Sequence, residues 1–138
     1  MTKTKKILAV DDDASGLAAI RQMLAQKGYE VAAVESGEEA LRLVAGEAFD
    51  LVVLDVMMPG LSGFEVCRRI REDPRNRDVP VIFLTGKGDS MDVYAAQEAG
   101  SDLYLVKPVL ATKLLNLVGL FLSEDPPLAH RRGPDSPG

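Results

Sequence analysis

Six residues that could bind a metal ion or a phosphate each follow a short apolar segment of this 138-residue chain. They are Asp11, Asp12, Asp13, Asp55, Thr85 and Lys107. If the apolar segments are parallel strands, their carboxyl ends meet at one edge of the sheet, where such folds bind ligands. We therefore expect these side chains to gather around one crevice, between the first and the third strand.

The acids at this edge indicate a site for a hard divalent cation. Several carboxylates in one crevice repel one another and therefore need a cation. The only histidine, His130, lies in the C-terminal tail, and the only cysteine, Cys67, is distant from the acids in the sequence. Because only oxygen ligands remain, Mg²⁺ is favoured over Zn²⁺. Asp13 has an alternative interpretation as the N-cap of the helix that follows it.

The same residues could carry out phosphoryl chemistry. A carboxylate beside a divalent ion, a lysine and a hydroxyl can be phosphorylated to a covalent aspartyl phosphate. The ion and Lys107 would neutralise charge on the phosphoryl oxygens, and the hydroxyl of Thr85 could bond one of them. Since His130 is the only histidine and lies in the tail, any phosphohistidine that this chemistry needs must come from another protein.

Five repeats of a strand followed by a helix must position these residues. The apolar patterns predict strands at residues 6–10, 30–34, 51–54, 80–84 and 103–106. Helices are expected at about 14–27, from Ser36 onward, from Ser62 to about 71, at about 89–99 and at about 111–122. Ser36 with Glu39, and Ser62 with Glu65, each match a capping box, in which each side chain bonds the other residue's backbone N–H.

This alternation predicts an α/β fold with a doubly wound, five-stranded parallel sheet. The segment at 51–54 is apolar on both faces, as is typical of a central strand with helices on both sides. Five βα units in about 120 residues fit the flavodoxin-like (βα)5 arrangement with strand order 2-1-3-4-5.

Composition and charge narrow the class of protein. The chain is 46% hydrophobic and 27% charged, which is typical of one globular domain. We expect this domain at residues 1–123 and a disordered tail at 124–138. The formal net charge of −5 disfavours nucleic acid as a direct partner. A single cysteine and the lack of a long apolar run favour the cytoplasm and no membrane segment.

Four short blocks, each at a predicted strand end, together resemble the signature of response-regulator receiver domains. The blocks are Val10-Asp11-Asp12, Leu54-Asp55-Val56-Met57-Met58-Pro59-Gly60, Leu84-Thr85-Gly86 and Val106-Lys107-Pro108. The resemblance covers residues from about 5 to about 122. It implies a switch of a two-component or phosphorelay system rather than an enzyme, with Mg²⁺ as cofactor and Mn²⁺ as a substitute. The implied partner is a sensor histidine kinase or a histidine phosphotransfer protein.

The resemblance also assigns roles at the acidic crevice. It implies that Asp55 accepts the phosphoryl group. Asp12 would ligate Mg²⁺ directly and Asp11 often through water, while Asp55 and the backbone carbonyl of Met57 would add two more ligands. The side chain of Met57 would also tune how fast the phosphate hydrolyses.

Further roles implied by the resemblance fall on the fourth and fifth strands. Lys107 would bind the phosphoryl oxygens, and its peptide bond to Pro108 would be cis. Thr85 would move on phosphorylation, and Tyr104 would then turn inward as the aromatic switch residue. Lys87, two residues after Thr85, would be a second residue that tunes hydrolysis.

The last predicted helix is apolar nearly all round, although a surface helix normally has a polar outer face. With one face on the sheet, we expect Leu115, Val118 and Leu122 on the outer side. Exposed apolar patches usually mark partner sites. The helix, together with the fourth helix and the fifth strand, is therefore predicted to bind a second copy or a downstream protein. Contact with a further domain or the tail is the alternative.

Two other functions fit part of the pattern. Residues 11–15 loosely match the D-x-D-x-[TV] motif of haloacid-dehalogenase-type phosphatases, which would make Asp11 the phosphorylated residue in place of Asp55. A pseudo-receiver, a binding module without phosphorylation, is disfavoured because every residue of the phosphorylation set is present.

Overall fold

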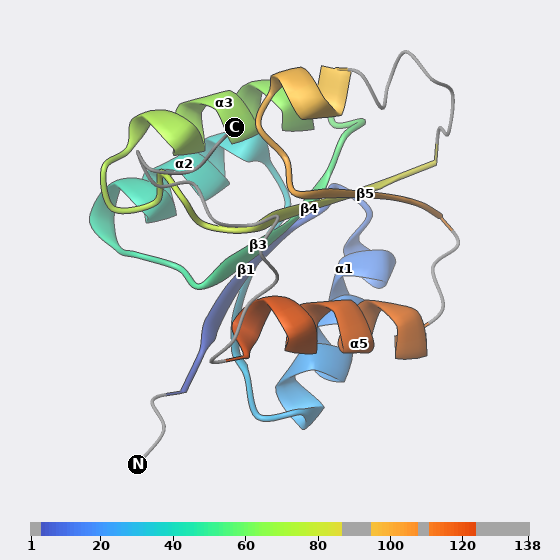
Figure 1. Cartoon of the computed structure of the whole chain (residues 1–138). Helices are drawn as coiled ribbons and strands as arrows, with labels where there is room; N and C mark the ends of the chain where they lie inside the picture. The colour runs from blue at the N-terminus through green and yellow to red at the C-terminus, as the bar shows by residue number, and fades with distance from the viewer. Residues whose placement is uncertain (1–3, 87–94, 108–110, 124–138) are drawn as a thin grey trace.

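Five parallel strands form one sheet in the computed structural model, which describes residues 4–86, 95–107 and 111–123. The strands are β1 Lys6–Val10, β2 Glu30–Val34, β3 Leu51–Asp55, β4 Val81–Thr85 and β5 Leu103–Val106. Their order in the sheet is β2-β1-β3-β4-β5 (Figure 1). The predicted fold class and strand order are therefore confirmed.

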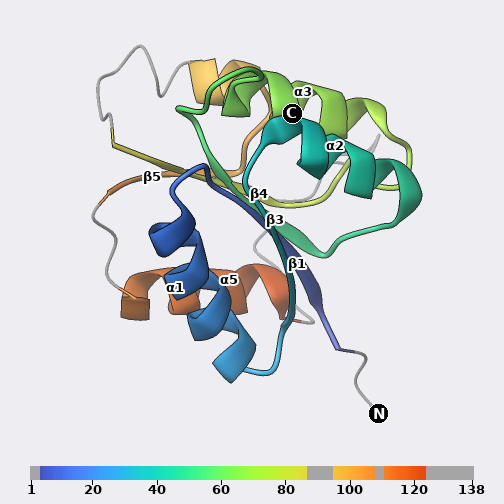
Figure 2. The same cartoon turned by 180° about the vertical axis from the view of Figure 1, so that it is seen from behind.

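Helices cover both faces of this sheet. They are α1 Ala14–Gln26, α2 Gly37–Gly46, α3 Gly63–Glu72 and α5 Ala111–Leu122, and residues 95–98 are also helical. Figures 1 and 2 show α1 and α5 on one face and α2 and α3 on the other. Most of the fourth predicted helix and the predicted disordered tail lie outside the described residues, as do Lys87 and Pro108. Within the described part of the chain, no helix has the length and apolar character that crossing a membrane requires.

The predicted capping boxes form only in part. The Ser36 hydroxyl accepts a hydrogen bond from the N–H of Glu39 at 3.2 Å, and the Ser62 hydroxyl does the same for Glu65 at 3.3 Å. The reverse bonds were predicted wrongly, because both glutamates bond elsewhere. The Glu39 carboxylate accepts from the Ser36 hydroxyl at 3.4 Å, and the Glu65 carboxylate pairs with two arginines of its own helix at 3.0 Å each. For Glu65 the reason is that charged donors three and four residues along a helix compete well with a neutral backbone N–H.

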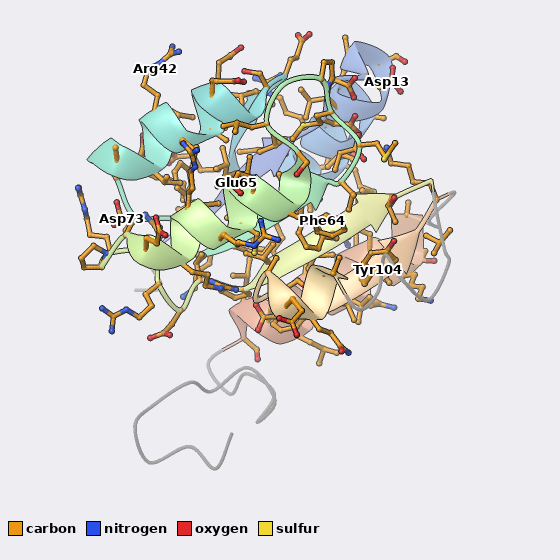
Figure 3. All side chains as sticks on the ribbon, turned by 90° about the horizontal axis from the view of Figure 1, so that it is seen from above. Asp13, Arg42, Phe64, Glu65, Asp73 and Tyr104 are labelled. Atoms are coloured by element: carbon orange, nitrogen blue, oxygen red, sulfur yellow. The ribbon has the colours of Figure 1, made fainter. Side chains whose placement is uncertain are left out.

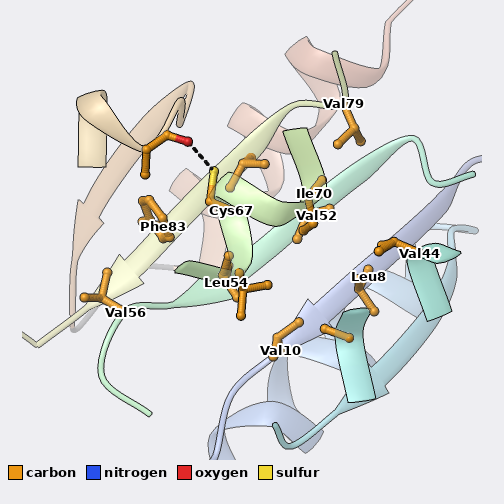
Figure 4. Close-up of a cluster of buried hydrophobic side chains, with 14 of the residues drawn as sticks. Leu8, Val10, Val44, Val52, Leu54, Val56, Cys67, Ile70, Val79 and Phe83 are labelled. Atoms are coloured by element: carbon orange, nitrogen blue, oxygen red, sulfur yellow. Dashed lines mark hydrogen bonds between the residues drawn. The ribbon is translucent and has the colours of Figure 1, made fainter. Parts of the chain in front are cut away.

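The core consists of two layers, one on each face of the sheet, because successive strand residues point to opposite faces. Leu8, Val10, Val52, Leu54 and Phe83 belong to the layer under α2 and α3, part of which is shown in Figure 4. Ile7, Leu51, Val53, Ile82 and Leu84 belong to the layer under α1 and α5. All residues of β3 and β4 are buried, so close packing on both faces of the sheet fixes the strand ends that carry Asp55 and Thr85.

The orientation of α5 differs from the prediction. Val118 is fully buried and lies on the inner stripe with Leu114, so its predicted outward position is wrong. Leu115 and Leu122 are half-buried and pack against the core layer that they share with α1. Leu120, at 55% exposure, is the large apolar side chain that α5 presents to solvent. The helix is rotated from the expected position because its buried stripe faces both the sheet and the side chains of α1.

Candidate functional site

Three carboxylates meet at the carboxyl end of the sheet, as the sequence predicts. β1 and β3 are hydrogen-bonded neighbours, and Asp11 and Asp55 stand at their ends. Asp11 is 3% exposed and Asp55 7%, whereas Asp12 is exposed. One carboxylate oxygen from each of the three residues lies within 4.8 Å of the others. The crevice between the first and third strands therefore holds a compact group of acids.

Lys107 and Thr85 join this group from the other half of the sheet. The Lys107 ammonium lies 3.0 Å from Oδ2 of Asp11 and 3.9 Å from Oδ1 of Asp55. Its backbone N–H donates to the carbonyl of Thr85 at 2.6 Å, which joins the ends of β4 and β5. Thr85 is fully buried, one residue beyond Leu84, the cross-strand neighbour of Asp55. Lys107 thus bridges the two acids of the crevice.

Backbone N–H groups hold the two buried acids in place. The N–H of Asp13 donates to Oδ1 of Asp11 at 2.9 Å, and the N–H of Met57 donates to Oδ1 of Asp55 at 3.4 Å. Asp13 occupies the N-cap position of α1, as one interpretation predicts, but its side chain accepts the hydroxyl of Ser15 at 3.2 Å instead of capping the helix. The Met57 side chain is 55% exposed and therefore lies outside the core.

The electrostatics of the site favour bound positive charge. Burial, followed by the neighbouring charge of Asp11, raises the pKa of Asp55 from 3.8 to about 6, although Lys107 and the N–H of Met57 act in the opposite direction. Burial by itself lowers the pKa of Lys107, but the hydrogen bond and charge of Asp11 outweigh it and raise that pKa above 10.5. A single lysine therefore leaves the carboxylates short of cationic charge.

A divalent oxygen-binding cation fits this arrangement. Six-coordinate Mg²⁺ with ligands at about 2.1 Å places its ligand oxygens about 3 to 4 Å apart. The oxygens of Asp11, Asp12 and Asp55 lie within 4.8 Å of one another, so small side-chain adjustments suffice. The potential ligand atoms that these three described residues offer are all carboxylate oxygens, which suits a hard ion.

Comparison with known proteins decides the family. Residues 7–119 match the model of the response regulator receiver domain. The chain belongs to this family. It is a receiver domain of the two-component type, a signalling switch.

Individual relatives agree with this assignment. Transcriptional regulatory protein AfsQ1 of Streptomyces coelicolor is 46% identical over 103 residues, which make up 75% of this chain and 44% of that protein. The receiver domain spans about half the length of the curated relatives it matches. Chemotaxis protein CheY4 of Vibrio cholerae superposes with a TM-score of 0.83 at 31% identity, over 87% of this chain and all of that one.

A further similar structure contains a metal ion. The receiver domain of sensor histidine kinase PA1611 from Pseudomonas aeruginosa has a TM-score of 0.79 and 31% identity, and covers 85% of this chain and 96% of its own. That structure holds a magnesium ion coordinated in its active-site cleft. The acidic group of Asp11, Asp12 and Asp55 in the present receiver domain is consistent with such a site.

The structure does not bring every predicted residue to the crevice. Tyr104 lies on β5, half-buried, and packs against the core layer under α3, so it does not face the acids directly. Sequence reasoning missed Gly63, the first residue of α3. A Cβ at this position would lie 2.2 Å from the carbonyl oxygen of Asp55. The sequence does contain a signal for this contact: a glycine directly follows the N-cap Ser62, although most other residues have a higher helix propensity at that position.

Proposed function

We propose that Asp55 is the phosphoryl acceptor of this receiver domain. The observation that carries the proposal is the approach of Lys107 to two buried acids, Asp11 at 3.0 Å and Asp55 at 3.9 Å, with the exposed Asp12 beside them. Asp11, Asp12 and Asp55 would hold Mg²⁺, and the backbone carbonyl of Met57 would add a further oxygen ligand. When bound, the ion supplies positive charge that neutralises the phosphoryl oxygens.

The proposed reaction is an in-line transfer from a phosphohistidine of the partner. An Asp55 oxygen attacks phosphorus, the new O–P bond forms as the P–N bond breaks, and the electron pair of that bond remains on the imidazole nitrogen. Lys107 binds a phosphoryl oxygen and exchanges part of its contact with Asp11 for the new group. Because the lysine is held at the mouth of the crevice by its strand end, little reorganisation is needed.

The response to phosphorylation would begin at Thr85. Its hydroxyl would bond the new phosphoryl group, and Tyr104 on the neighbouring strand would then turn inward and shift a two-state equilibrium. Met57, whose N–H donates to Asp55 and whose side chain is exposed, would tune hydrolysis. Lys87 as a second tuning residue, and a cis bond between Lys107 and Pro108, complete the proposal, although Lys87 and Pro108 lie outside the described residues.

The partners would use different faces. A sensor histidine kinase or a histidine phosphotransfer protein would supply the phosphoryl group at the crevice. The output would pass to a second copy or a downstream protein through the fourth helix, β5 and α5. This face is supported by two exposed apolar side chains, Val106 at 45% and Leu120 at 55% exposure. We further propose that residues 1–123 form the receiver unit, that 124–138 are a tail, and that the protein acts in the cytoplasm.

The proposal is tested by intact-protein mass spectrometry after incubation with Mg²⁺ and acetyl phosphate. We expect a phosphoryl adduct on the wild type that EDTA prevents and that Asp55→Asn abolishes. An adduct that persists in Asp55→Asn and disappears in Asp11→Asn would instead support the phosphatase-type nucleophile. Absence of any adduct, both with acetyl phosphate and with a phosphorylated kinase, would support a pseudo-receiver.

A further inference from the structure

Three aromatic side chains form a continuous row between α3 and β5. The ring centroids of Phe64 and Phe83 are 5.3 Å apart with an interplanar angle of 81°, and those of Phe83 and Tyr104 are 6.5 Å apart with an angle of 71°. Both pairs have the edge-to-face geometry that aromatic rings prefer. Phe83 is fully buried, whereas Phe64 and Tyr104 are half-buried on the side of the sheet that faces α3 (Figure 3). We call these residues the aromatic row.

One end of the aromatic row is attached to the phosphoacceptor segment. Gly63, which precedes Phe64, donates its N–H to the carbonyl of Val56 at 3.0 Å. The space for a Cβ on Gly63 is already filled by backbone, with the Asp55 oxygen at 2.2 Å and the Val56 Cα at 2.9 Å. The first turn of α3 therefore rests directly on the backbone of Asp55 and Val56. A displacement of that backbone must displace the helix start and Phe64 with it.

The other end of the aromatic row adjoins the proposed switch residue. Phe83 is the cross-strand neighbour of Tyr104 on one side and of Leu54, which precedes Asp55, on the other. It lies within the buried layer that also contains Val56 (Figure 4). The Phe83 ring thus bounds the space into which the Tyr104 ring could move. Because protein interiors are closely packed, a small shift of Phe83 changes the room available to Tyr104.

We propose that Phe64 and Phe83 are positioning residues that couple the phosphorylation state of Asp55 to the orientation of Tyr104. The inference rests on the proposed function of Asp55. Addition of a phosphoryl group would shift the backbone at 55–56, then the first turn of α3, then the Phe64 and Phe83 rings. This route passes through the core and is physically separate from the route through the Thr85 hydroxyl. It supplies the contiguous packed contacts that coupling between two sites can use.

The inference can be tested by ¹⁹F NMR of protein labelled with 3-fluorotyrosine. The chain has three tyrosines, and Tyr104→Phe identifies the resonance of interest. Beryllofluoride with Mg²⁺ serves as the phosphoryl mimic. In the wild type we expect the Tyr104 resonance to move as the mimic binds. Phe64→Leu and Phe83→Leu should each remove most of that displacement and change the titration midpoint about threefold to tenfold, as one aromatic contact allows. The double variant should change it by less than the product of the single effects.

Phe49→Leu is the matched control. Phe49 is 6% exposed and belongs to the same core layer, but it precedes β3 at the far end of the sheet. It should lower stability comparably and leave the Tyr104 displacement unchanged. Phe83→Met has nearly the same side-chain volume as Phe83→Leu but a flexible, unbranched shape. It provides a second variant that should show the same loss.

Two results would overturn the inference. One is a Tyr104 displacement in folded Phe64→Leu and Phe83→Met that equals the wild type and the Phe49→Leu control. The other is an unchanged chemical shift of the Tyr104 resonance in wild-type protein that has gained the Asp55 adduct. That result would refute the coupling but not phosphoryl acceptance. Loss of the adduct itself would instead refute the proposed function, so the two failures are distinguishable.

Discussion

Replacing Asp55 with asparagine should stabilise the metal-free receiver domain against unfolding. In the absence of Mg²⁺, Asp55 is a 7% exposed carboxylate beside Asp11, and the charge of Lys107 is shared between the two acids. Asparagine keeps the shape and an oxygen that can accept the N–H of Met57, but it removes the charge. The substitution therefore removes the repulsion between the carboxylates of positions 55 and 11, which a bound cation would otherwise offset.

The size of this effect follows from the pKa of Asp55. A rise from 3.8 in the unfolded chain to about 6 in the folded protein corresponds to about 3 kcal/mol in favour of the protonated form. Screening by solvent at the open side of the crevice reduces this to about 1–2 kcal/mol. Since the folded state binds this proton more tightly, stability falls as the pH rises from 3.8 towards 6 and then levels off. The gain from Asp55→Asn should thus be about twice as large at pH 8 as at pH 5.

The assay is urea denaturation with EDTA at both pH values, with Asp12→Asn as the matched control. Asp12 is exposed, so its substitution should give a smaller gain. Saturating Mg²⁺ should stabilise the wild type more than Asp55→Asn and thereby reduce or reverse the difference, because the variant lacks one ligand. Our reasoning would be refuted by a variant that is no more stable than the wild type at pH 8 with EDTA, or whose gain is larger at pH 5.

Three further substitutions test other contacts. Lys107→Met should slow acquisition of the phosphoryl adduct about a hundredfold, measured by mass spectrometry, and an unchanged rate would contradict its role. Gly63→Ala should destabilise by about 1–3 kcal/mol in urea because its Cβ would overlap backbone, whereas Gly46→Ala, with open space around it, should not destabilise. Arg71→Met should lose about 3–5 kcal/mol because it removes the cation 3.0 Å from the buried Asp102 carboxylate, which keeps the N–H of Val81 at 2.8 Å. If adding Asp102→Asn to Arg71→Met restores none of this loss, the ion-pair explanation is wrong.

Sequence reasoning located the site because the carboxyl ends of parallel strands must converge. The pattern of apolar segments predicted the bounds of β1, β2, β5 and α5 correctly and those of β3 and β4 within one residue at either end. Asp11, Asp55 and Lys107 each follow a strand end, so the topology alone brings them to one crevice. This prediction does not depend on the spacing of residues within any one helix or strand.

Features that depend on packing between elements could not be predicted in this way. The rotation of α5 that buries Val118 is set by α1 as well as by the sheet, and periodicity along one helix does not contain that information. The contact of Gly63 with the backbone of Asp55 depends on where α3 docks. The aromatic row depends on cross-strand register, which places Phe83 beside Tyr104.

Chemical location of the phosphoryl group tests the central claim most directly. After phosphorylation with Mg²⁺ and acetyl phosphate, reduction with borohydride converts an aspartyl phosphate to homoserine, which peptide mass spectrometry can place in the sequence. Our account predicts homoserine at position 55 and unmodified aspartate at positions 11, 12 and 13. Homoserine at position 11, or at any position other than 55, would contradict it.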